Sequence, residues 1–236
     1  MQDIYAFDVG DYGKLGLLRH VMAQELSLGV VWWKTQLGSP GLDGKHLAYL
    51  RDRTYRQCDP ELWDAMCACV SKGPRSIEAL ESLFPEGTTF FADVIPADAN
   101  RRLLWSDKSM ASARDKDVVF CDPDNGIAFT ETSRSQRHVS LSELQKFYSD
   151  GHSLVVYHHL NRSCSHAEQI EAGSRVLMES VTDGTPVWSA HFRRGTSRVY
   201  FVMPQAKHID AMKRALQQLS ISRWCDHGHF NVASKF

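Results

Sequence analysis

The stretch Asp117-Val118-Val119-Phe120-Cys121-Asp122-Pro123-Asp124-Asn125-Gly126-Ile127 decides the fold. Val118 to Cys121 is an unbroken apolar run, typical of a strand that is buried on both faces. The run stops at Asp-Pro-Asp-Asn-Gly, because proline cannot donate to a sheet and Asn-Gly favours a tight turn. We therefore expect two carboxylates and a carboxamide at the carboxyl end of a central strand, where open α/β sheets bind their ligands. A polar turn with a helix cap would use the same residue types.

Composition sets the broad class of protein. A chain of 236 residues with 43% hydrophobic and 23% charged residues is long enough for one α/β domain with a sizeable core. The net charge of −1 means that any anion site must be a local patch. No apolar run approaches the ~20 residues of a membrane helix, and Met-Gln-Asp-Ile-Tyr does not begin like a secretory signal. We expect a cytoplasmic protein with no membrane partner.

Apolar runs and amphipathic stretches alternate on both sides of the central strand. A helical insertion is expected at about 51–84, and strands at 186–192 and 197–203 predict a hairpin with Arg193, Arg194 and Arg198 near its tip. The fold expected is α/β and Rossmann-like, with a mostly parallel sheet, helices on both faces and a C-terminal antiparallel β-hairpin, as a single domain over 1–236. The other strands are expected at 29–33, 88–95 and 153–157.

The N-terminal segment Asp8-Val9-Gly10-Asp11-Tyr12-Gly13-Lys14-Leu15-Gly16 has an unusual composition for a helix. The apolar spacing predicts a helix from about Tyr12 with Asp11 as its N-cap. Glycines cost ~1 kcal/mol each in a helix relative to alanine, so three of them indicate that something approaches the backbone closely. Asp8, Asp11 and Lys14 would then face a ligand. The alternative is a capped entry helix with a solvated polar face.

Two other expected strands also end in polar residues. The loop after Trp33 is glycine-rich but matches no standard nucleotide fingerprint, so we interpret it as a lid or binding loop. The strand that ends at Tyr157 runs into His158-His159-Leu160-Asn161-Arg162. Paired histidines at a strand end favour a functional site over isolated structural imidazoles.

The order of elements resembles class I S-adenosylmethionine-dependent methyltransferases, in which the last two strands form an antiparallel hairpin beside an otherwise parallel sheet. Within that class, the chain is most similar to bacterial ribosomal-RNA adenine methyltransferases with a polar N-terminal helix and an Asp-Pro-Pro-Tyr motif. Gly10 to His20 looks like their opening segment, Asp122-Pro123-Asp124-Asn125 stands in place of Asp-Pro-Pro-Tyr, and Phe192-Arg193-Arg194-Gly195-Thr196 stands at the hairpin. The chain also resembles a group of bacterial proteins with Gly-Asp-Tyr-Gly-Lys and Asp-Pro-Asp-Asn-Gly motifs, a likeness that implies no activity.

The chain departs from the methyltransferase pattern at three places. The strand that ends at Trp33 lacks the acidic, glycine-rich loop that usually holds the methionine part of the cofactor. Asp124 stands where a proline is expected. Asn125 replaces the aromatic residue that stacks on a flipped-out base.

The resemblance implies transfer of a methyl group from S-adenosylmethionine to an amino group of a nucleic-acid base. Asp122 and Asn125 would position the target nitrogen, and positioning is most of what such a transfer needs from the protein. Asp124, His158 and His159 are further catalytic candidates. The expected cofactor loop contains Gly38, Gly41 and Asp43. The cations expected to hold substrate phosphates are Lys14, Arg19, Lys45, Arg193 and Arg194.

The same residues also fit a metal-dependent nuclease or phosphodiesterase. Asp122 and Asp124 repel each other unless a proton or a cation lies between them. Carboxylates and imidazoles together suit Mg²⁺ or Mn²⁺, and the residues that would complete such a set are Asp8, Asp11, His158 and His159. A third hypothesis is a methyltransferase-like scaffold that binds nucleic acid or protein without catalysis.

Overall fold

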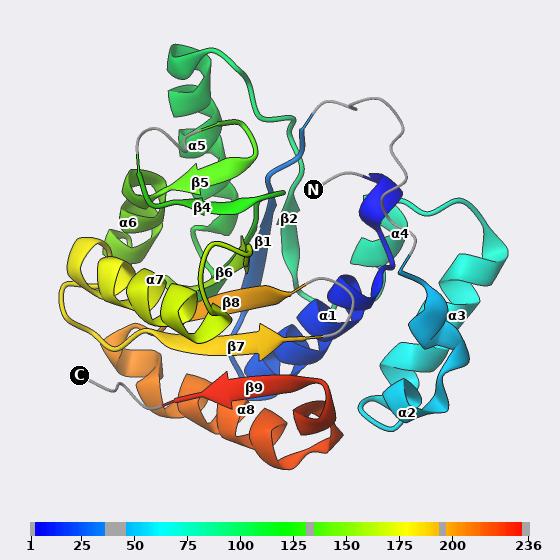
Figure 1. Ribbon diagram of the computed structural model, residues 1–236. Helices are drawn as coiled ribbons and strands as arrows, with labels where there is room; N and C mark the ends of the chain where they lie inside the picture. Colours follow the sequence, from blue (N-terminus) through cyan, green and yellow to red (C-terminus); the bar gives the residue numbers. More distant parts are fainter. Residues whose placement is uncertain (1–2, 36–45, 131–134, 194–196, 233–236) are drawn as a thin grey trace.

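A mixed seven-stranded sheet forms the centre of the computed structural model, which describes residues 3–35, 46–130, 135–193 and 197–232 (Figure 1). The strand order is β2-β1-β3-β6-β8-β7-β9, and β4 pairs with β5 in a separate two-stranded parallel sheet. The strands are β1 Leu28–Trp32, β2 Thr89–Phe91, β3 Val118–Asp122, β4 Gly126–Ala128, β5 His138–Ser140, β6 Ser153–His159, β7 Trp188–Phe192, β8 Arg198–Met203 and β9 Gly228–Asn231.

Helices cover both faces of this sheet (Figure 1). Within the described residues, no helix is long and apolar enough to cross a membrane. The α-helices are α1 Val9–Met22, α2 Arg53–Arg56, α3 Pro60–Lys72, α4 Ile77–Glu81, α5 Ala99–Ala113, α6 Leu141–Ser149, α7 His166–Ser180 and α8 Ile209–Ile221. The short 3₁₀ helices are η1 Asp3–Tyr5, η2 Ala48–Arg51, η4 Ala206–His208 and η5 Arg223–Asp226.

Strand direction changes halfway across the sheet. The pairings β2·β1, β1·β3 and β3·β6 are parallel, whereas β6·β8, β8·β7 and β7·β9 are antiparallel. The expected hairpin is therefore confirmed as β7 and β8, but the expectation of a mostly parallel sheet is wrong. The physical reason is that β8 lies between β6 and β7, and that the C-terminal tail adds β9 to the edge at Ser189–Phe192.

Alternation along the strands builds a separate core on each face of the sheet. Val30, Trp32 and Phe120 pack with α1, α3 and α8 in one apolar cluster. Val31, Trp33 and their neighbours on the other face pack with α5, α6 and α7. Because successive strand residues point to opposite faces, runs such as 118–122 must be apolar at every position. This two-sided burial is why the central strands are recognisable from sequence.

The carboxyl ends of β1 and β3 form a topological switch point. The chain leaves β1 towards β2 on one side, and it leaves β3 towards β6 on the other. Open α/β sheets bind ligands in the crevice at such a point. The polar exit at Asp122 lies beside Trp32, its register partner in β1.

Candidate functional site

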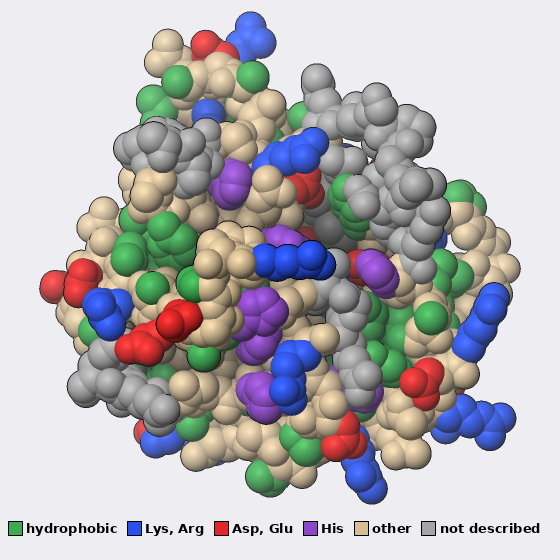
Figure 2. Space-filling view, viewed as in Figure 1, with side chains coloured by type: hydrophobic (Ala, Val, Ile, Leu, Met, Phe, Trp, Pro, Cys, Tyr) green, Lys and Arg blue, Asp and Glu red, His purple; other side chains and the backbone are tan. Residues whose placement is uncertain are grey.

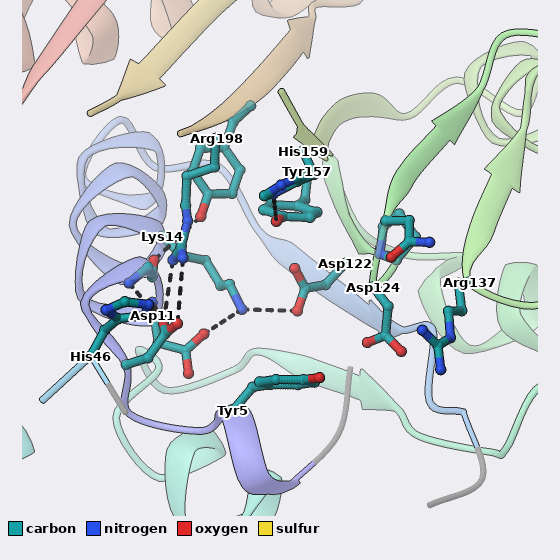
Figure 3. Close-up of a pocket in the computed structure, with 15 residues that line it drawn as sticks. Tyr5, Asp11, Lys14, His46, Asp122, Asp124, Arg137, Tyr157, His159 and Arg198 are labelled. Atoms are coloured by element: carbon teal, nitrogen blue, oxygen red, sulfur yellow. Dashed lines mark hydrogen bonds and ion pairs between the residues drawn. The ribbon is translucent and has the colours of Figure 1, made fainter. Parts of the chain in front are cut away.

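A cavity of about 260 Å³ lies at the carboxyl edge of the parallel strands (Figure 3). Three groups of residues line it, from the N-terminal segment, from the exit of β3, and from β6 and β8. From the first group come Tyr5, Asp8, Gly10, Asp11 and Lys14; from the second Asp122, Pro123, Asp124 and Asn125; from the third Tyr157, His159, Arg198 and Tyr200; His46 and Arg137 complete the lining. Most of the expected site residues that the structure describes therefore meet in one place.

Helix α1 begins three residues earlier than the sequence pattern suggests. Asp8 is its N-cap, and the Asp8 Oδ1 accepts hydrogen bonds from Gly10 N at 2.7 Å and Asp11 N at 3.0 Å. Asp11, expected as the cap, instead lies in the first turn. Its Oδ2 accepts from Phe7 N at 2.8 Å, which leaves Oδ1 directed at Lys14. The correction matters because it places both carboxylates inside the structure rather than in solvent.

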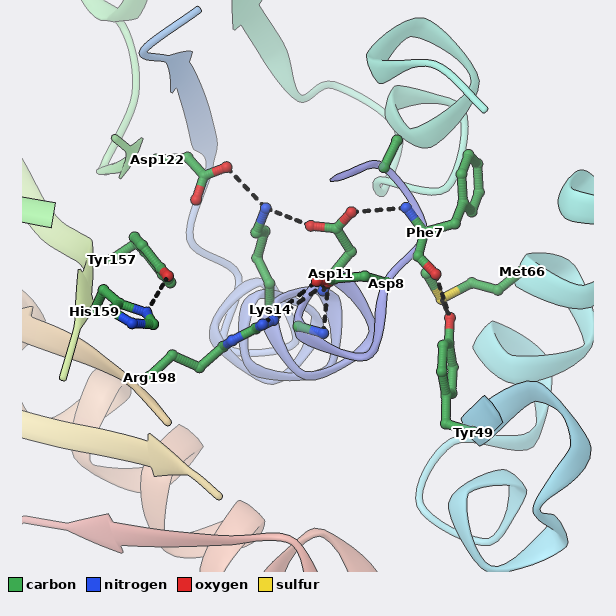
Figure 4. Close-up of polar contacts among 12 residues, drawn as sticks. Phe7, Asp8, Asp11, Lys14, Tyr49, Met66, Asp122, Tyr157, His159 and Arg198 are labelled. Carbon is green, nitrogen blue, oxygen red and sulfur yellow. Dashed lines mark hydrogen bonds and ion pairs between the residues drawn. The ribbon is translucent and has the colours of Figure 1, made fainter. Parts of the chain in front are cut away.

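Lys14 joins α1 to the exit of β3 (Figure 4). The Lys14 Nζ lies 2.6 Å from Asp11 Oδ1 and 2.8 Å from Asp122 Oδ2. It also stands 5.1 Å from the centre of the Trp32 ring and 5.7 Å from that of Phe120, within the range of cation–π attraction. Lys14 is 3% exposed, so it is a buried bridge between two carboxylates rather than the phosphate ligand expected from the sequence.

The glycines of α1 are explained by the protein's own side chains. A Cβ at Gly10 would overlap the guanidinium of Arg198, and one at Gly16 would overlap the Trp224 ring. A Cβ at Gly13 would stand 3.0 Å from the Phe192 ring. The expectation that something approaches this backbone closely is correct, but Arg198, Phe192 and Trp224 do so. Of these, the guanidinium of Arg198 pairs with Asp8 at 3.3 Å.

The inner wall of the cavity has an excess of negative charge. Three carboxylates (Asp8, Asp11 and Asp122) and two cations (Lys14 and Arg198) are each less than a tenth exposed, which leaves one carboxylate in excess. We call these five residues the buried charge cluster. Unequal charge at low dielectric is costly and shifts the balance of protonation. The cluster therefore favours either a proton or a positively charged ligand.

Protonation states in the cluster follow from this balance. Burial lowers the pKa of Lys14, but the Asp11 and Asp122 carboxylates outweigh it and raise the pKa above its usual value. Burial raises the pKa of Asp8, but Arg198 outweighs it and holds the pKa below its usual value. At Asp11, burial and the Asp8 and Asp122 charges prevail over Lys14 and raise the pKa to about 6. Of Asp8 and Asp11, Asp11 is therefore the carboxylate that takes up a proton first as the pH falls.

The exit of β3 is fixed by contacts with two neighbouring segments. The Thr35 hydroxyl donates to Asp124 Oδ2 at 2.8 Å, which ties the end of β1 to the end of β3. The Asn125 N–H donates to Arg137 O at 2.9 Å, while the Asn125 side chain is exposed at the cavity. Asp122 is held by Lys14 on one oxygen. The Asp122 and Asp124 carboxylates and the backbone of Asn125 are therefore positioned before any ligand arrives.

The exit of β6 divides its two histidines between different environments. His158 does not line the cavity; its Nδ1 accepts from Ile127 N at 3.0 Å, and its ring packs on Phe129 and Phe201. Burial, reinforced by His159 and His138, lowers the pKa of His158 to about 4, so the ring is neutral near pH 7. His159 lines the cavity and is exposed. Of the two histidines expected to share one site, the structure brings only His159 to the cavity.

The remaining site expectations fall outside the cavity or outside the described residues. Arg19 pairs with Asp59 at 2.9 Å and with Glu61 at 3.3 Å, and Arg193 is exposed at the end of β7. Neither lines the cavity. Four expected cofactor or phosphate residues, Gly38, Gly41, Asp43 and Lys45, lie in the segment 36–45, which together with Arg194 is outside the described residues.

The acidic residues do not form a metal centre in the part of the chain that is described. No group of three or more His, Cys, Asp or Glu side chains there is arranged to hold a metal ion. The reason is visible in the cluster, where Lys14 lies between Asp11 and Asp122 and Arg198 pairs with Asp8. Asp8, Asp11 and Asp122, which were expected to bind Mg²⁺ or Mn²⁺, are each paired with an ammonium or guanidinium group, and Asp124 accepts from the Thr35 hydroxyl.

Several cavity residues were not expected from the sequence. Arg198 was interpreted as part of a basic hairpin tip, but it lies in β8 and is 6% exposed. Tyr157 and Tyr200 belong to apolar runs and carry no local signal of function. Tyr5 and Arg137 come from segments without a clear pattern. Only the alternation of β8, which places residues 198 and 200 on the same face, could have linked Arg198 to Tyr200.

Comparisons with known proteins give a distant structural likeness. No protein-family model and no curated protein matches this chain. Nine chains of solved structure match it. One is the crystal structure of protein LPL1258 from Legionella pneumophila str. Philadelphia 1, family-model DUF519, with 11% sequence identity and a TM-score of 0.47 over 95% of this chain and 96% of that one. At this TM-score we transfer neither fold nor function from it.

Proposed function

We propose that this protein is an S-adenosylmethionine-dependent methyltransferase that acts on an amino group of a nucleic-acid base, on a Rossmann-like scaffold. The observation that carries the proposal is the buried charge cluster, with Asp122 fixed by Lys14 at a cavity on the switch point of the sheet. Ligand sites of α/β enzymes occur at that point of the sheet. The hairpin of β7 and β8 beside the parallel strands agrees with the same class of fold.

The excess carboxylate in the cluster suits a sulfonium cofactor. S-adenosylmethionine supplies an electrophilic methyl group on a positively charged sulfur. A sulfonium needs negative potential but no set of ligand oxygens, whereas a divalent metal needs several. The inner wall offers that potential, while Lys14 engages one oxygen each of Asp11 and Asp122, and Arg198 engages both oxygens of Asp8. The donor set therefore fits this cofactor better than it fits a metal ion.

Asp122 and Asn125 would hold the reacting amino group. Their side-chain oxygens can each accept one of its hydrogens, which orients the nitrogen lone pair into the cavity. Because Lys14 fixes Asp122, little rotational freedom is lost when the substrate binds. Once the nitrogen has gained the methyl group it carries one proton too many, and the Asp122 carboxylate is placed to accept that proton and pass it to solvent.

Two tyrosines offer the aromatic surface that position 125 lacks. Tyr5 and Tyr157 line the cavity, and in Figure 3 their rings lie on either side of the Asp122 carboxylate. Bases taken out of a stack bind between aromatic or apolar side chains, with their polar edge hydrogen-bonded. A planar base between Tyr5 and Tyr157 would present its amino group to Asp122. The aromatic residue missing from the motif is thus supplied by other segments.

Calorimetry with S-adenosylmethionine and with its uncharged product, S-adenosylhomocysteine, tests the proposal. We expect saturable binding of both by the parent. Asp11→Asn removes the excess negative charge but keeps the side-chain shape. Relative to the parent, this variant should lose affinity for the sulfonium form by about tenfold, as expected for one charge at ~1.4 kcal/mol, and change little towards the uncharged form.

The other hypotheses are outcomes of the same titrations. The metal-dependent hydrolase predicts three results together: Mg²⁺ or Mn²⁺ raises the melting temperature, the Asp124→Ala substitution abolishes that rise, and S-adenosylmethionine does not bind. That combination would show that the methyltransferase proposal is wrong. If neither kind of ligand binds, the scaffold is retained for binding alone. If Asp11→Asn changed the affinities for S-adenosylmethionine and S-adenosylhomocysteine equally, the buried charge cluster would not be what attracts the sulfonium.

A further inference from the structure

Exposed arginines and histidines continue from the cavity mouth across one face of the protein. Figure 2 shows blue and purple side chains following one another down the middle of this face. We call this surface the arginine–histidine band, and it consists of Arg137, His159, Arg162, His166, Arg193 and His229. All but His166 are exposed, and His166 is half-buried.

Hydrogen bonds, strand register and a shared cavity wall join the members of the band into one surface. Arg137 and His159 line the same cavity. Beyond His159, Leu160 N donates to Ser197 O at 3.2 Å, and Ser197 Oγ lies 2.9 Å from His166 Nδ1. The Ser197 hydroxyl also reaches His191 Nε2 at 3.0 Å, and His191 is the register partner of His229.

The remaining two members are fixed by backbone contacts at the same edge. Arg193 N donates to His227 O at 3.0 Å, which places Arg193 beside the strand that bears His229. Arg162 lies in a turn where Asn161 Oδ1 accepts from Ser163 N at 2.8 Å. The band therefore crosses the ends of β6, β7 and β9 and the start of α7.

Among the described residues, the three arginines of the band have no acidic partner. Arg137, Arg162 and Arg193 take part in no ion pair with another described residue, whereas Arg19 and Arg56 each pair with an aspartate. Glu168, in the first turn of α7, accepts from Ser165 in a capping box. Such a run of unpaired cations on a chain of net charge −1 is a local anion-binding surface.

Positive charge beside the band contributes to the pKa shifts of two histidine rings. Burial, with smaller contributions from His166, His229 and Arg193, lowers the pKa of His191 to about 4. Burial likewise lowers the pKa of His159, with Arg198 and His166 adding to the effect. Arg193 and Arg198 thus add positive potential at these two rings, which favours an anion beside them.

We propose that the band holds the phosphodiester backbone of a single-stranded nucleic acid whose base enters the cavity. The inference rests on the proposed function for the identity of the ligand. A nucleic acid is favoured over other polyanions because the band leads into a cavity lined by Tyr5, Tyr157 and Asp122, which suits a flipped-out base. Backbone contacts of this kind supply affinity without reading sequence.

Fluorescence anisotropy with labelled oligouridylate and oligothymidylate of about 16 nucleotides tests the proposal. Each phosphate neutralised on a single strand contributes about 0.7 to the slope of log affinity against log salt. Reversing the charge of Arg137, Arg162 and Arg193 together, as Arg→Glu, should weaken binding at least tenfold at low salt and reduce that slope by about 2. A difference in affinity between the two probes would show whether the protein distinguishes ribose from deoxyribose.

The matched control is Arg114→Glu. Arg114 is also exposed, but it follows α5 and precedes β3, at the opposite edge of the sheet from the cavity. It should leave oligonucleotide affinity and salt slope unchanged. Circular dichroism and melting temperature establish that each variant is folded, and single Arg→Glu variants show whether the loss is shared along the band.

Three results would overturn the band as a nucleic-acid surface. One is parent-like affinity and salt slope in the triple variant. Another is equal loss in Arg114→Glu, and the third is binding to vesicles containing phosphatidylserine but not to either oligonucleotide. Failure of the proposed function would give a different result: the parent would not bind S-adenosylmethionine, but it would still bind the oligonucleotides along the band. A double variant with Arg162→Glu and Arg193→Glu, at two residues that do not line the cavity, should keep parent affinity for S-adenosylmethionine.

Discussion

The buried charge cluster and the arginine–histidine band meet at one cavity, but they treat charge in opposite ways. In the cluster, Lys14 and Arg198 are buried and each is paired with a carboxylate. In the band, the three arginines are exposed and make no ion pair with a described residue. A buried charge is tolerated only with its partners, whereas an exposed one costs little to keep unpaired. The difference predicts that changes in the cluster affect folding, and changes in the band affect binding alone.

The largest effect is expected from Lys14→Met, which keeps the length of the side chain and removes the ammonium. Asp11 and Asp122 would then be buried without a cation between them. Removing one partner of a buried ion pair costs about 3–5 kcal/mol. Urea denaturation should show this loss against the parent. A loss under about 1 kcal/mol would mean that the cluster is open to water and is not the low-dielectric group described above.

The next largest effect is expected from Gly10→Ala. A methyl group there overlaps the guanidinium of Arg198, so the arginine must move away from Asp8. Overpacking of this kind costs about 1–3 kcal/mol. Gly73→Ala is the control, because a Cβ at Gly73 meets nothing within 4 Å. Equal melting temperatures for the two variants would contradict the close approach of Arg198 to helix α1.

The two histidines of β6 sharpen the comparison within one strand. His158→Ala removes the acceptor of the Ile127 N–H and should cost about 1–2 kcal/mol of stability. His159→Ala should change stability by less than about 0.5 kcal/mol, because the side chain is exposed. Oligonucleotide affinity should fall more in His159→Ala than in His158→Ala. If instead His158→Ala lost oligonucleotide affinity and His159→Ala lost stability, His158 and not His159 would lie at the ligand.

The smallest effect concerns the pH dependence contributed by Asp11. Its pKa of about 6 in the folded protein is above the unfolded value of 3.8. The folded state therefore binds this proton more tightly, and the stabilisation that it gives is lost as the pH rises through 6. Relative to Asp11→Asn, the parent should lose about 1 kcal/mol between pH 5 and pH 7. A difference that stayed flat, or changed in the other direction, would remove the excess charge assigned to the cluster.

The elements with strong local patterns were predictable. Residues 118–122 form a buried central strand because burial on both faces demands an apolar run. Asp59 and Ser76 cap α3 and α4 as their positions suggest. The small sheet of β4 and β5 and the edge strand β9 were not expected, since three or four residues carry too little pattern to be recognised.

Half of the site was predictable for the same reason. Polar residues at the carboxyl ends of buried strands, such as Asp122 and His159, are conspicuous in a sequence. Arg198 was not, because its role depends on tertiary contact with Asp8, 190 residues away along the chain. The N-cap was placed at Asp11 rather than Asp8 because both are acceptable caps. Only the fold, which turns Asp11 towards Lys14, decides between them.

Methyl transfer itself tests the central claim most directly. The measurement is incorporation of label from S-[methyl-³H]adenosylmethionine into unmodified RNA and DNA oligonucleotides of random sequence. The parent should incorporate label, Asp122→Asn should reduce the rate at least a hundredfold while staying folded, and Asn125→Ala, on an exposed side chain, should reduce it without loss of stability. Undiminished incorporation by Asp122→Asn, or none by a parent that binds both the cofactor and the oligonucleotides, would contradict the account.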